Sequence, residues 1–372
     1  MKRILMLNYE FPPLGGGAAN ATFYLLKEFA ENNDIEIDMI TSSGDEYKEE
    51  QFASNIRIYY LDIGKSENIH YQSNRDLLTY ARKAHKKARE LKGQKNYDLI
   101  HAFFGIPCGY IAMKLGLPYI VSLRGSDVPF YSKRFYWLDK FLFKHLSKKI
   151  WKKAKAVIAN SEGLKNLALK SVPDQKIDVI HNGVDVKNFQ KINENLKLKN
   201  EKFTVLFVGR LIERKGVKYL IDAFAKLNAL KDCQLLIAGG GDQEKELKDQ
   251  VERTSQTDSV HFLGALPHSD LPKIYRQGDV YVLPSFNEGM SNTLLEAMAS
   301  GLPIVVTDTG GTRELVKGNG IIIEKGNADS IFDALFELKL DPEKRHKFGE
   351  TSLKLAKEMS WAKAADKYMC YY

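Results

Sequence analysis

The chain has 372 residues, of which 44% are hydrophobic and 27% charged, and its formal net charge is +8 at pH 7. This length is too great for one compact core of ordinary size and predicts two domains. No apolar run is long enough to span a bilayer, and the apolar start of the chain is too short for a signal peptide. The three cysteines have neither paired nor metal-like spacing, which favours reduced thiols and a cytoplasmic location.

The first half of the chain alternates short apolar runs with helical patterns. The predicted strands cover residues 3–8, 35–40, 56–60, 98–101, 119–123, 156–159 and 177–180. Strands that alternate with helices predict an α/β fold with a doubly wound, mostly parallel sheet. We expect this first domain to cover residues 1–185, followed by a polar linker, rich in Lys and Asn, at residues 185–202.

A second alternating series begins after the linker. Its predicted strands cover residues 203–208, 234–238, 260–263, 280–283 and 303–306. This pattern predicts a second domain of the same class at residues 203–358. The tail at about residues 360–372 is predicted to be a helix rich in aromatic residues, which needs a surface to bury against.

The most informative segment lies between the last two strands of the second series. It carries Glu288 and Glu296 on either side of a predicted helix start. Because ligands of parallel sheets bind where the strands end, Glu288 falls in the ligand-binding loop and Glu296 about two helical turns further on. The backbone N–H groups of Gly289, Met290 and Ser291 lie at the helix N-terminus, a favourable place for an anion.

This segment, EGMSNTLLEAMASGLP, resembles the signature of the retaining glycosyltransferases of family 4: two glutamates separated by seven residues and followed by EAMA-x-G-x-P. The resemblance implies the GT-B fold, in which two Rossmann-like doubly wound domains face each other across a cleft and the last helix packs back onto the first domain. It also implies a nucleotide-diphosphate sugar as donor, retention of anomeric configuration, and no metal ion or other cofactor. Relatives often have Phe-Gly where this chain has Met290-Ser291, a departure in the expected donor-sugar pocket.

Two cationic residues follow the first strand of the second domain. The segment from Gly209 to Gly216, GRLIERKG, matches the family pattern GR-x4-KG. Transfer of a sugar from a nucleotide requires stabilisation of a departing diphosphate, which cations and aligned N–H groups can supply. The resemblance implies that Arg210 and Lys215 contact the phosphates. It also implies that Glu288 contacts the sugar or stabilises an oxocarbenium-like transition state, and that Glu296 binds the ribose. The alternative is an ordinary turn with solvated charges.

Two glycine loops follow other strands. The first, at residues 15–17, precedes a predicted helix, and the resemblance places Gly16 and Gly17 near the donor diphosphate. The second, at residues 239–241, implies that Gly240 lies near the nucleotide base. A plain turn is the alternative for each loop. The first loop lacks the GxGxxG fingerprint, which argues against a nicotinamide dehydrogenase.

One position departs from the family pattern in the first domain. Relatives often have His-Gly-x-Asp or His-Gly-x-Glu where this chain has Arg124-Gly125-Ser126-Asp127. Arginine cannot act as a base near neutral pH, but it can bind a phosphate or a sugar hydroxyl in a catalytic site. The alternative is that Arg124 forms a salt bridge with Asp127. The resemblance places Asp127 and Asn182 on the acceptor side, with Asn182 shaping the hinge and the cleft floor.

Nearly all of the positive net charge lies in the first domain, on two predicted basic helices at residues 82–95 and 133–155. The second helix has a predicted core stripe of Leu138, Leu142, Leu146 and Ile150. Basic faces with aromatic residues suit an anionic membrane surface, whereas solvated surface helices are the alternative. Nucleic acid is not expected as a partner, because no binding signature accompanies the charge.

Four histidines occur singly in predicted strands and loops, and we expect each to be structural: His101, His181, His261 and His268. The sequence has no Asp-x-Asp motif and no cluster of His and Cys residues, so no bound metal is expected.

The sequence thus predicts a glycosyltransferase that moves a sugar from a nucleotide-diphosphate donor to a glycan or lipid-linked acceptor, in surface polysaccharide or glycolipid synthesis. We expect a cytoplasmic protein with a peripheral position on the inner face of the membrane. Two alternatives stay open. One is a nucleotide-sugar hydrolase or epimerase of the same fold. The other is a non-catalytic subunit that binds glycans or nucleotide sugars, which the replacement at Arg124 would suit.

Overall fold

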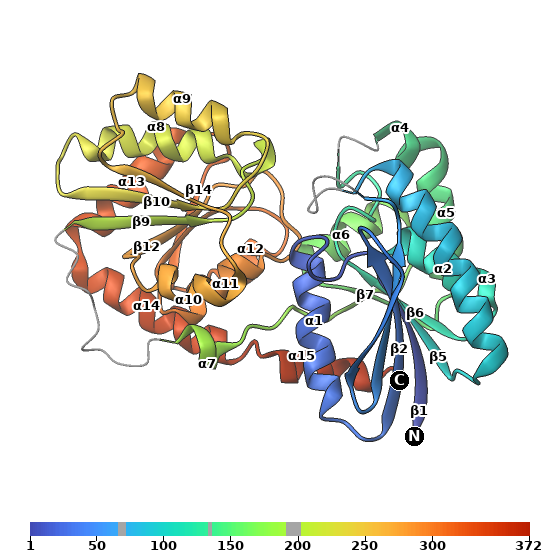
Figure 1. Ribbon diagram of the computed structural model, residues 1–372. Helices are drawn as coiled ribbons and strands as arrows, with labels where there is room; N and C mark the ends of the chain where they lie inside the picture. Colours follow the sequence, from blue (N-terminus) through green and yellow to red (C-terminus); the bar gives the residue numbers. More distant parts are fainter. Residues whose placement is uncertain (66–71, 133–135, 191–201) are drawn as a thin grey trace. The chain divides into compact units, whose positions relative to one another are not determined.

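The computed structural model describes residues 1–65, 72–132, 136–190 and 202–372. The chain divides into two compact units. The N-terminal unit comprises Met1–Asn182 together with Trp361–Tyr372, and the C-terminal unit comprises Gly183–Ser360. Each is an α/β unit built on a mostly parallel sheet (Figure 1). The predicted linker at residues 185–202 lies largely outside the described residues, at 191–201. Its first part forms α7 (Val186–Phe189), which belongs to the C-terminal unit.

The sheet of the N-terminal unit has eight strands in the order β3-β4-β2-β1-β5-β6-β7-β8. They are β1 (Lys2–Leu7), β2 (Ile35–Ser43), β3 (Lys48–Ala53), β4 (Ile56–Asp62), β5 (Leu99–Phe103), β6 (Tyr119–Leu123), β7 (Ala156–Ala159) and β8 (Asp178–Val179). The central strands are continuous apolar runs because helices cover both faces of a parallel sheet. The strand order reverses between β1 and β5, which makes this point the expected ligand-binding end of the unit.

The helices of the N-terminal unit are α1 (Gly17–Ala30), α2 (Asn74–Gln94), α3 (Tyr110–Leu115), α4 (Tyr136–Leu138), α5 (Lys144–Lys153), α6 (Glu162–Ser171) and α15 (Trp361–Met369). Two π-helical turns, Gly105–Gly109 and Asp139–Phe143, precede α3 and α5. The aromatic tail is buried here: the ring of Trp361 stacks on that of Tyr24 with 5.7 Å between centroids. The hydroxyl of Tyr372 lies 2.6 Å from Nδ1 of His101.

The sheet of the C-terminal unit has six parallel strands in the order β11-β10-β9-β12-β13-β14. They are β9 (Phe203–Val208), β10 (Cys233–Ala238), β11 (Val260–Gly264), β12 (Val280–Leu283), β13 (Ile304–Thr307) and β14 (Gly320–Ile323). This is the doubly wound dinucleotide-fold order, which reverses between β9 and β12.

The helices of the C-terminal unit, besides α7, are α8 (Val217–Asn228), α9 (Glu244–Arg253), α10 (Leu271–Tyr275), α11 (Asn292–Ala299), α12 (Thr312–Leu315), α13 (Ala328–Leu340) and α14 (Pro342–Lys357). Short 3₁₀ turns lie at Glu213–Lys215 and His268–Asp270. α8 packs against α9 and α13, whereas α11 packs against α10 and α14.

Two strands were not predicted, and both lie at sheet edges. β3 begins with the polar run Lys-Glu-Glu-Gln and pairs antiparallel with β4. Charged edge strands discourage pairing with other chains, but they lack the apolar pattern by which a strand is recognised. β14 starts with a glycine and is only partly buried, so its short apolar run gave too weak a signal.

The predicted core stripe of the second basic helix is wrong at two of its four positions. Leu138 and Leu142 are 43% and 52% exposed, whereas Ile150 is fully buried. Leu138 lies just before the π-helical turn at Asp139–Phe143 and Leu142 lies within it, and this turn widens the helix and breaks the regular repeat on which the stripe was predicted. Residues 133–135 of this predicted helix lie outside the described residues. Within the part of the chain that the structure describes, no helix has the length and apolar character to cross a membrane.

Candidate functional site

The strongest candidate site lies at the topological switch point of the C-terminal unit. β9 and β12 are neighbours there, and the loops that follow them carry Arg210, Lys215 and Glu288. The backbone N–H of Phe286 donates to the carbonyl oxygen of Arg214 at 2.8 Å, which ties the two loops together. Residues 73 positions apart in the sequence therefore meet at the edge where ligands of such sheets bind.

Lys215 and Glu288 form a buried ion pair. Nζ of Lys215 donates to Oε1 of Glu288 at 2.7 Å, and the two side chains are 10% and 9% exposed. Burial alone would raise the pKa of Glu288, but the charges of Lys215 and Arg214 and the hydrogen bond from Lys215 hold it below its ordinary value. Glu288 is therefore a carboxylate at neutral pH, held in one position by a single strong donor.

The surroundings of this pair carry an excess of positive charge. Burial lowers the pKa of Lys215, and the like charges of Arg214 and Arg210 act in the same direction, while Glu288 offsets part of the effect. Lys215 and Arg214 thus act on the carboxylate of Glu288, and Arg210 adds a third positive charge near Lys215. A site of this kind favours an anionic ligand, because an added negative charge relieves the repulsion among the cations.

The start of α11 supplies backbone N–H groups beside this cluster. Ser291 is its N-cap, and its hydroxyl accepts a hydrogen bond from the N–H of Leu294. The neighbouring Gly289 accepts one from the N–H of Gly311 at 2.7 Å. Gly310, at φ 41°, has no room for a side chain, since a Cβ there would overlap the carbonyl oxygen of Glu288. The loop after β13 therefore holds the Glu288 loop in place.

Glu296 lies in the second turn of α11, only 6% exposed. Its Oε1 is 2.8 Å from Nε2 of His268, and its Oε2 accepts a hydrogen bond from the hydroxyl of Tyr275 at 2.9 Å. Burial alone would lower the pKa of His268, but the hydrogen bond and charge of Glu296 raise it. Both oxygens of Glu296 are thus oriented by protein donors. Each oxygen keeps a second lone pair for a ligand hydroxyl.

Sequence reasoning missed His268 and Tyr275 as parts of the site. The sequence predicts His268 to be a structural histidine, yet its ring contacts the carboxylate of Glu296, which is predicted to bind ribose. The two residues come from the turn before α10 and from its end, 28 and 21 positions before Glu296. A weak signal was their position between β11 and β12, in the connection that leads to the strand before the Glu288 loop.

The second glycine loop packs against the Arg210 loop. The carbonyl oxygen of Gly240 accepts a hydrogen bond from the N–H of Leu211 at 2.9 Å. A Cβ at Gly239, where φ is 138°, would overlap the carbonyl oxygen of Gly209. The glycines thus allow two backbone loops to touch at the carboxyl ends of β9 and β10.

The predicted residues of the N-terminal unit form a second group. Gly16 is the N-cap of α1 and Gly17 its first residue, in the loop that follows β1 at the switch point of this sheet. The carboxylate of Asp127 is buried and accepts backbone hydrogen bonds from Gly105, Arg124 and Gly125 at 2.8–3.0 Å. Burial raises the pKa of Asp127 although these bonds act in the opposite direction. Asp127 therefore shapes the loops after β5 and β6.

The guanidinium of Arg124 pairs with Asn182 and not with Asp127. Its Nη1 donates to Oδ1 of Asn182 at 2.9 Å, and its Cζ lies 5.0 Å from the ring centroid of Phe103. The alternative of a salt bridge to Asp127 is therefore not what the structure has, since that carboxylate is occupied by backbone N–H groups. Arg124 links the end of β6 to the last residue of the first segment of this unit.

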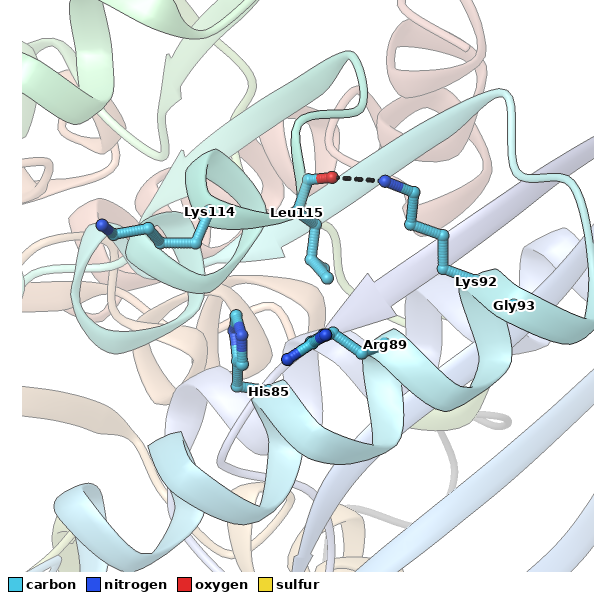
Figure 2. A pocket seen from close by; sticks show the side chains of 6 residues that line it. All are labelled: His85, Arg89, Lys92, Gly93, Lys114 and Leu115. Carbon is cyan, nitrogen blue, oxygen red and sulfur yellow. Dashed lines mark hydrogen bonds between the residues drawn. The ribbon is translucent and has the colours of Figure 1, made fainter.

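A hollow of about 530 Å³ lies on the N-terminal unit between α2 and α3. Its lining residues are His85, Arg89, Lys92, Gly93, Lys114 and Leu115. Figure 2 shows His85 and Arg89 directed toward each other, whereas Lys92 reaches across to the carbonyl oxygen of Leu115 at 2.7 Å. None of the lining residues is acidic, so the hollow forms a cationic part of the basic helix predicted at residues 82–95.

Two family models match the chain in succession. The model described as Glycosyltransferase Family 4 matches residues 15–188, and that described as Glycosyl transferases group 1 matches residues 188–355. An uncharacterized glycosyltransferase of Methanocaldococcus jannaschii is 30% identical over 88% of this chain and 87% of its own length. A UDP-Gal:alpha-D-GlcNAc-diphosphoundecaprenol alpha-1,3-galactosyltransferase of Escherichia coli is 31% identical over 68% of this chain and 69% of its own length.

Solved structures share the fold over the whole chain. Sucrose-phosphate synthase from Thermosynechococcus elongatus superposes with a TM-score of 0.87 at 21% identity, covering 100% of this chain and 98% of its own. Anabaena HepE, solved in complex with UDP and glucose, superposes with a TM-score of 0.77 at 21% identity, covering 100% and 99%. Together with the paired glutamates and the cationic loop at the switch point, these matches show that the chain belongs to the glycosyltransferases of group 1, family 4, and has the GT-B fold.

Proposed function

We propose that the chain transfers a sugar from a nucleotide-diphosphate donor to an acceptor with retention of anomeric configuration and without a metal ion. The observation that carries this proposal is the buried Lys215–Glu288 pair inside a cationic cluster at the switch point of the C-terminal unit. Such a cluster can neutralise the charge that develops on a departing diphosphate, which is the main electrostatic demand of the reaction.

We propose a protein contact for each part of the nucleotide-sugar donor. Arg210 and Lys215 contact the two phosphates, with the N–H groups at the start of α11 beside them. When the phosphates take over Lys215, the carboxylate of Glu288 becomes available to the hydroxyl groups of the sugar. Glu296, already oriented by His268, accepts two hydrogen bonds from the ribose. Gly240 lies near the base.

Retention follows if the acceptor attacks on the face from which the diphosphate departs. The leaving phosphate then helps to remove the acceptor proton, so the protein needs no separate base. Arg124 fits this scheme because an arginine cannot accept a proton near neutral pH. We infer that Arg124, together with Asn182, contributes hydrogen bonding on the acceptor side, with Gly16 and Gly17 near the diphosphate.

The acceptor is proposed to be a glycan or a lipid-linked sugar of surface polysaccharide or glycolipid synthesis. Support comes from the Escherichia coli relative, whose name gives a diphosphoundecaprenol-linked acceptor. The cationic hollow on α2 and the lysines of α5 support a peripheral position at an anionic membrane surface.

Donor binding and turnover test the proposal separately. A thermal-shift screen of nucleoside diphosphates and their sugars should give one base whose ligands raise the melting temperature. Incubation of that donor with lipid-linked and free glycan acceptors should give a glycoside whose anomeric configuration, measured by NMR, equals that of the donor. Glu288→Gln should keep the nucleoside diphosphate shift and lose product, and EDTA should leave the wild-type rate unchanged.

The two alternatives give different outcomes. Release of free or isomerised sugar at the same rate with and without acceptor would identify a hydrolase or an epimerase. Donor binding without any turnover, together with full biological activity of Glu288→Gln, would identify a non-catalytic binding subunit.

A further inference from the structure

A continuous group of aromatic rings lies on the surface of the N-terminal unit around α4. The ring of Phe130 meets that of Tyr136 at 5.9 Å between centroids, Tyr136 meets Trp137 at 5.6 Å, and Trp137 stacks on Phe141 at 6.1 Å. We call these rings and their two leucine neighbours the aromatic patch. Its members are Phe130, Tyr136, Trp137, Leu138, Phe141 and Leu142. Figure 1 shows α4 at the upper end of this unit.

The aromatic patch is open to solvent. Trp137 and Phe141 are 66% and 69% exposed, and the other four members are between 38% and 52% exposed. Single exposed apolar residues need no explanation, but six within residues 130–142, four of them linked by ring contacts, form the kind of patch that marks an interaction surface. Leu138 and Leu142, which lie before and within the π-helical turn, face solvent instead of the core.

The exposed charges of the described helical segment that carries the patch, residues 136–155, are of one sign. Asp139 is the one acidic residue of the segment from 133 to 155, and it is buried, with its carboxylate accepting a hydrogen bond from the N–H of Phe130 at 2.8 Å. Nζ of Lys140 lies 5.6 Å and 5.7 Å from the ring centroids of Trp137 and Phe141. Exposed lysines continue along α5 at Lys148 and Lys149. The segment thus combines exposed apolar rings with exposed cations.

We propose that the aromatic patch inserts into the interfacial region of an anionic phospholipid bilayer, with Lys140 and the lysines of α5 at the phosphate level. Tryptophan and tyrosine favour this region because their rings are apolar and their polar atoms reach water. Anionic headgroups supply the complementary charge that the surface lacks. This inference rests on the peripheral membrane position proposed above. It adds that apolar side chains enter the bilayer, whereas the earlier proposal requires only attraction between charges.

A second copy of the chain is a poorer occupant. A two-fold symmetric contact through this patch would bring Lys140 and the α5 lysines of both copies together without any acidic partner. The cores of protein interfaces are also depleted in lysine. A bilayer avoids both difficulties, because its headgroups are mobile anions that can surround each lysine.

The three tryptophans make the insertion measurable in the wild-type protein. Trp151 and Trp361 are 0% and 4% exposed, so a change of environment on vesicle binding reports Trp137. We expect a blue shift of the emission with vesicles of phosphatidylcholine and phosphatidylglycerol, and quenching when bromine is placed near the glycerol end of the acyl chains. Emission that stays unchanged while the protein cosediments with these vesicles would overturn insertion and leave only electrostatic contact.

A matched pair of variants separates the patch from general surface effects. Trp137→Ser/Phe141→Ser should weaken partitioning to anionic vesicles by about tenfold or more. Full burial of even one large apolar side chain is worth about tenfold, so this factor is a lower limit for the loss of two. Leu340→Ser, at a residue 65% exposed on the C-terminal unit, should bind as the wild type does. Part of the wild-type binding should persist at about 0.5 M salt, where a purely electrostatic contact is screened.

Three further results would refute the inference. They are equal vesicle binding by the double variant and the wild type, no binding of the wild type to the vesicles of phosphatidylcholine and phosphatidylglycerol, and a wild-type dimer that becomes a monomer only in the double variant. The donor thermal shift should be the same in all variants, which keeps the two proposals apart. Vesicle insertion without donor binding would refute the proposed transfer alone. Donor turnover without insertion would refute this inference alone.

Discussion

The buried pair between Lys215 and Glu288 allows a quantitative prediction about the stability of the C-terminal unit. Lys215→Met removes the cation 2.7 Å from a carboxylate that is 9% exposed, which leaves that charge buried without its nearest partner. Breaking a buried pair from one side costs about 3–5 kcal/mol. For a unit of this size, each 1 kcal/mol lowers the melting temperature by about 2–4 °C, so a fall of about 6–20 °C is expected.

The pair itself contributes far less than this penalty. Lys215→Met/Glu288→Gln removes both charges, and the double variant should recover most of the stability that Lys215→Met loses. The matched control is Lys226→Met, which breaks an ion pair with Asp329 whose side chains are 50% and 72% exposed. That change should lower stability by less than about 1 kcal/mol, because solvent screens an exposed pair.

Scanning calorimetry of the wild type and the four variants, including Glu288→Gln, at pH 7.5 measures these differences without any ligand. The reasoning would be refuted if Lys215→Met unfolded within about 1 kcal/mol of the wild type, or if the penalties of the two single variants added in the double variant. Either result would mean that the other cations of the cluster, or water, neutralise Glu288 in place of Lys215.

Two further predictions concern the same unit. The pKa of His268 is raised in the folded state by Glu296, so its stabilising effect is complete below the unfolded pKa of about 6.5 and is lost as pH rises through the higher folded pKa. His268→Gln keeps a donor for Glu296 but cannot titrate, and the pH dependence of its unfolding free energy above pH 6 should be flatter than in the wild type; parallel curves would contradict this. Gly310→Ala should abolish the donor-induced thermal shift, because its Cβ overlaps the carbonyl oxygen of Glu288. Gly318→Ala, at φ 76° but with open space, should retain that shift and lose only about 1–2 kcal/mol, and equal effects of the two alanines would show that strain alone matters.

Much of the fold could be predicted from the sequence because its central strands are buried on both faces. A run such as Phe203–Val208 is apolar except for Thr204 and is buried throughout, which is typical of a parallel strand between helices. β3 could not be recognised in this way, because at a sheet edge its Lys and Glu side chains protect it from other chains. Edge strands are defined by their neighbours more than by their own residues.

The residues of the candidate site could be proposed from the sequence, but their contacts could not. Arg210, Lys215 and Glu288 stood out because two family patterns contained them, yet neither pattern indicates that Lys215 and Glu288 touch. That contact depends on which strands are adjacent, and strand order is a property of the whole sheet. The contact between His268 and Glu296 could not be predicted for the same reason. The turn before α10 places His268 beside Glu296 only once the sheet has formed.

The placement of α15 has a consequence for biosynthesis. Residues 361–372 belong to the N-terminal unit although the whole C-terminal unit precedes them in the chain. During translation, Tyr24 and His101 can therefore contact Trp361 and Tyr372 only after the whole C-terminal unit has been synthesised. Domains usually fold in the order in which they emerge. Here the C-terminal unit can be complete while the earlier unit still lacks one helix, so the emergence of residues 361–372 is the event that closes its core.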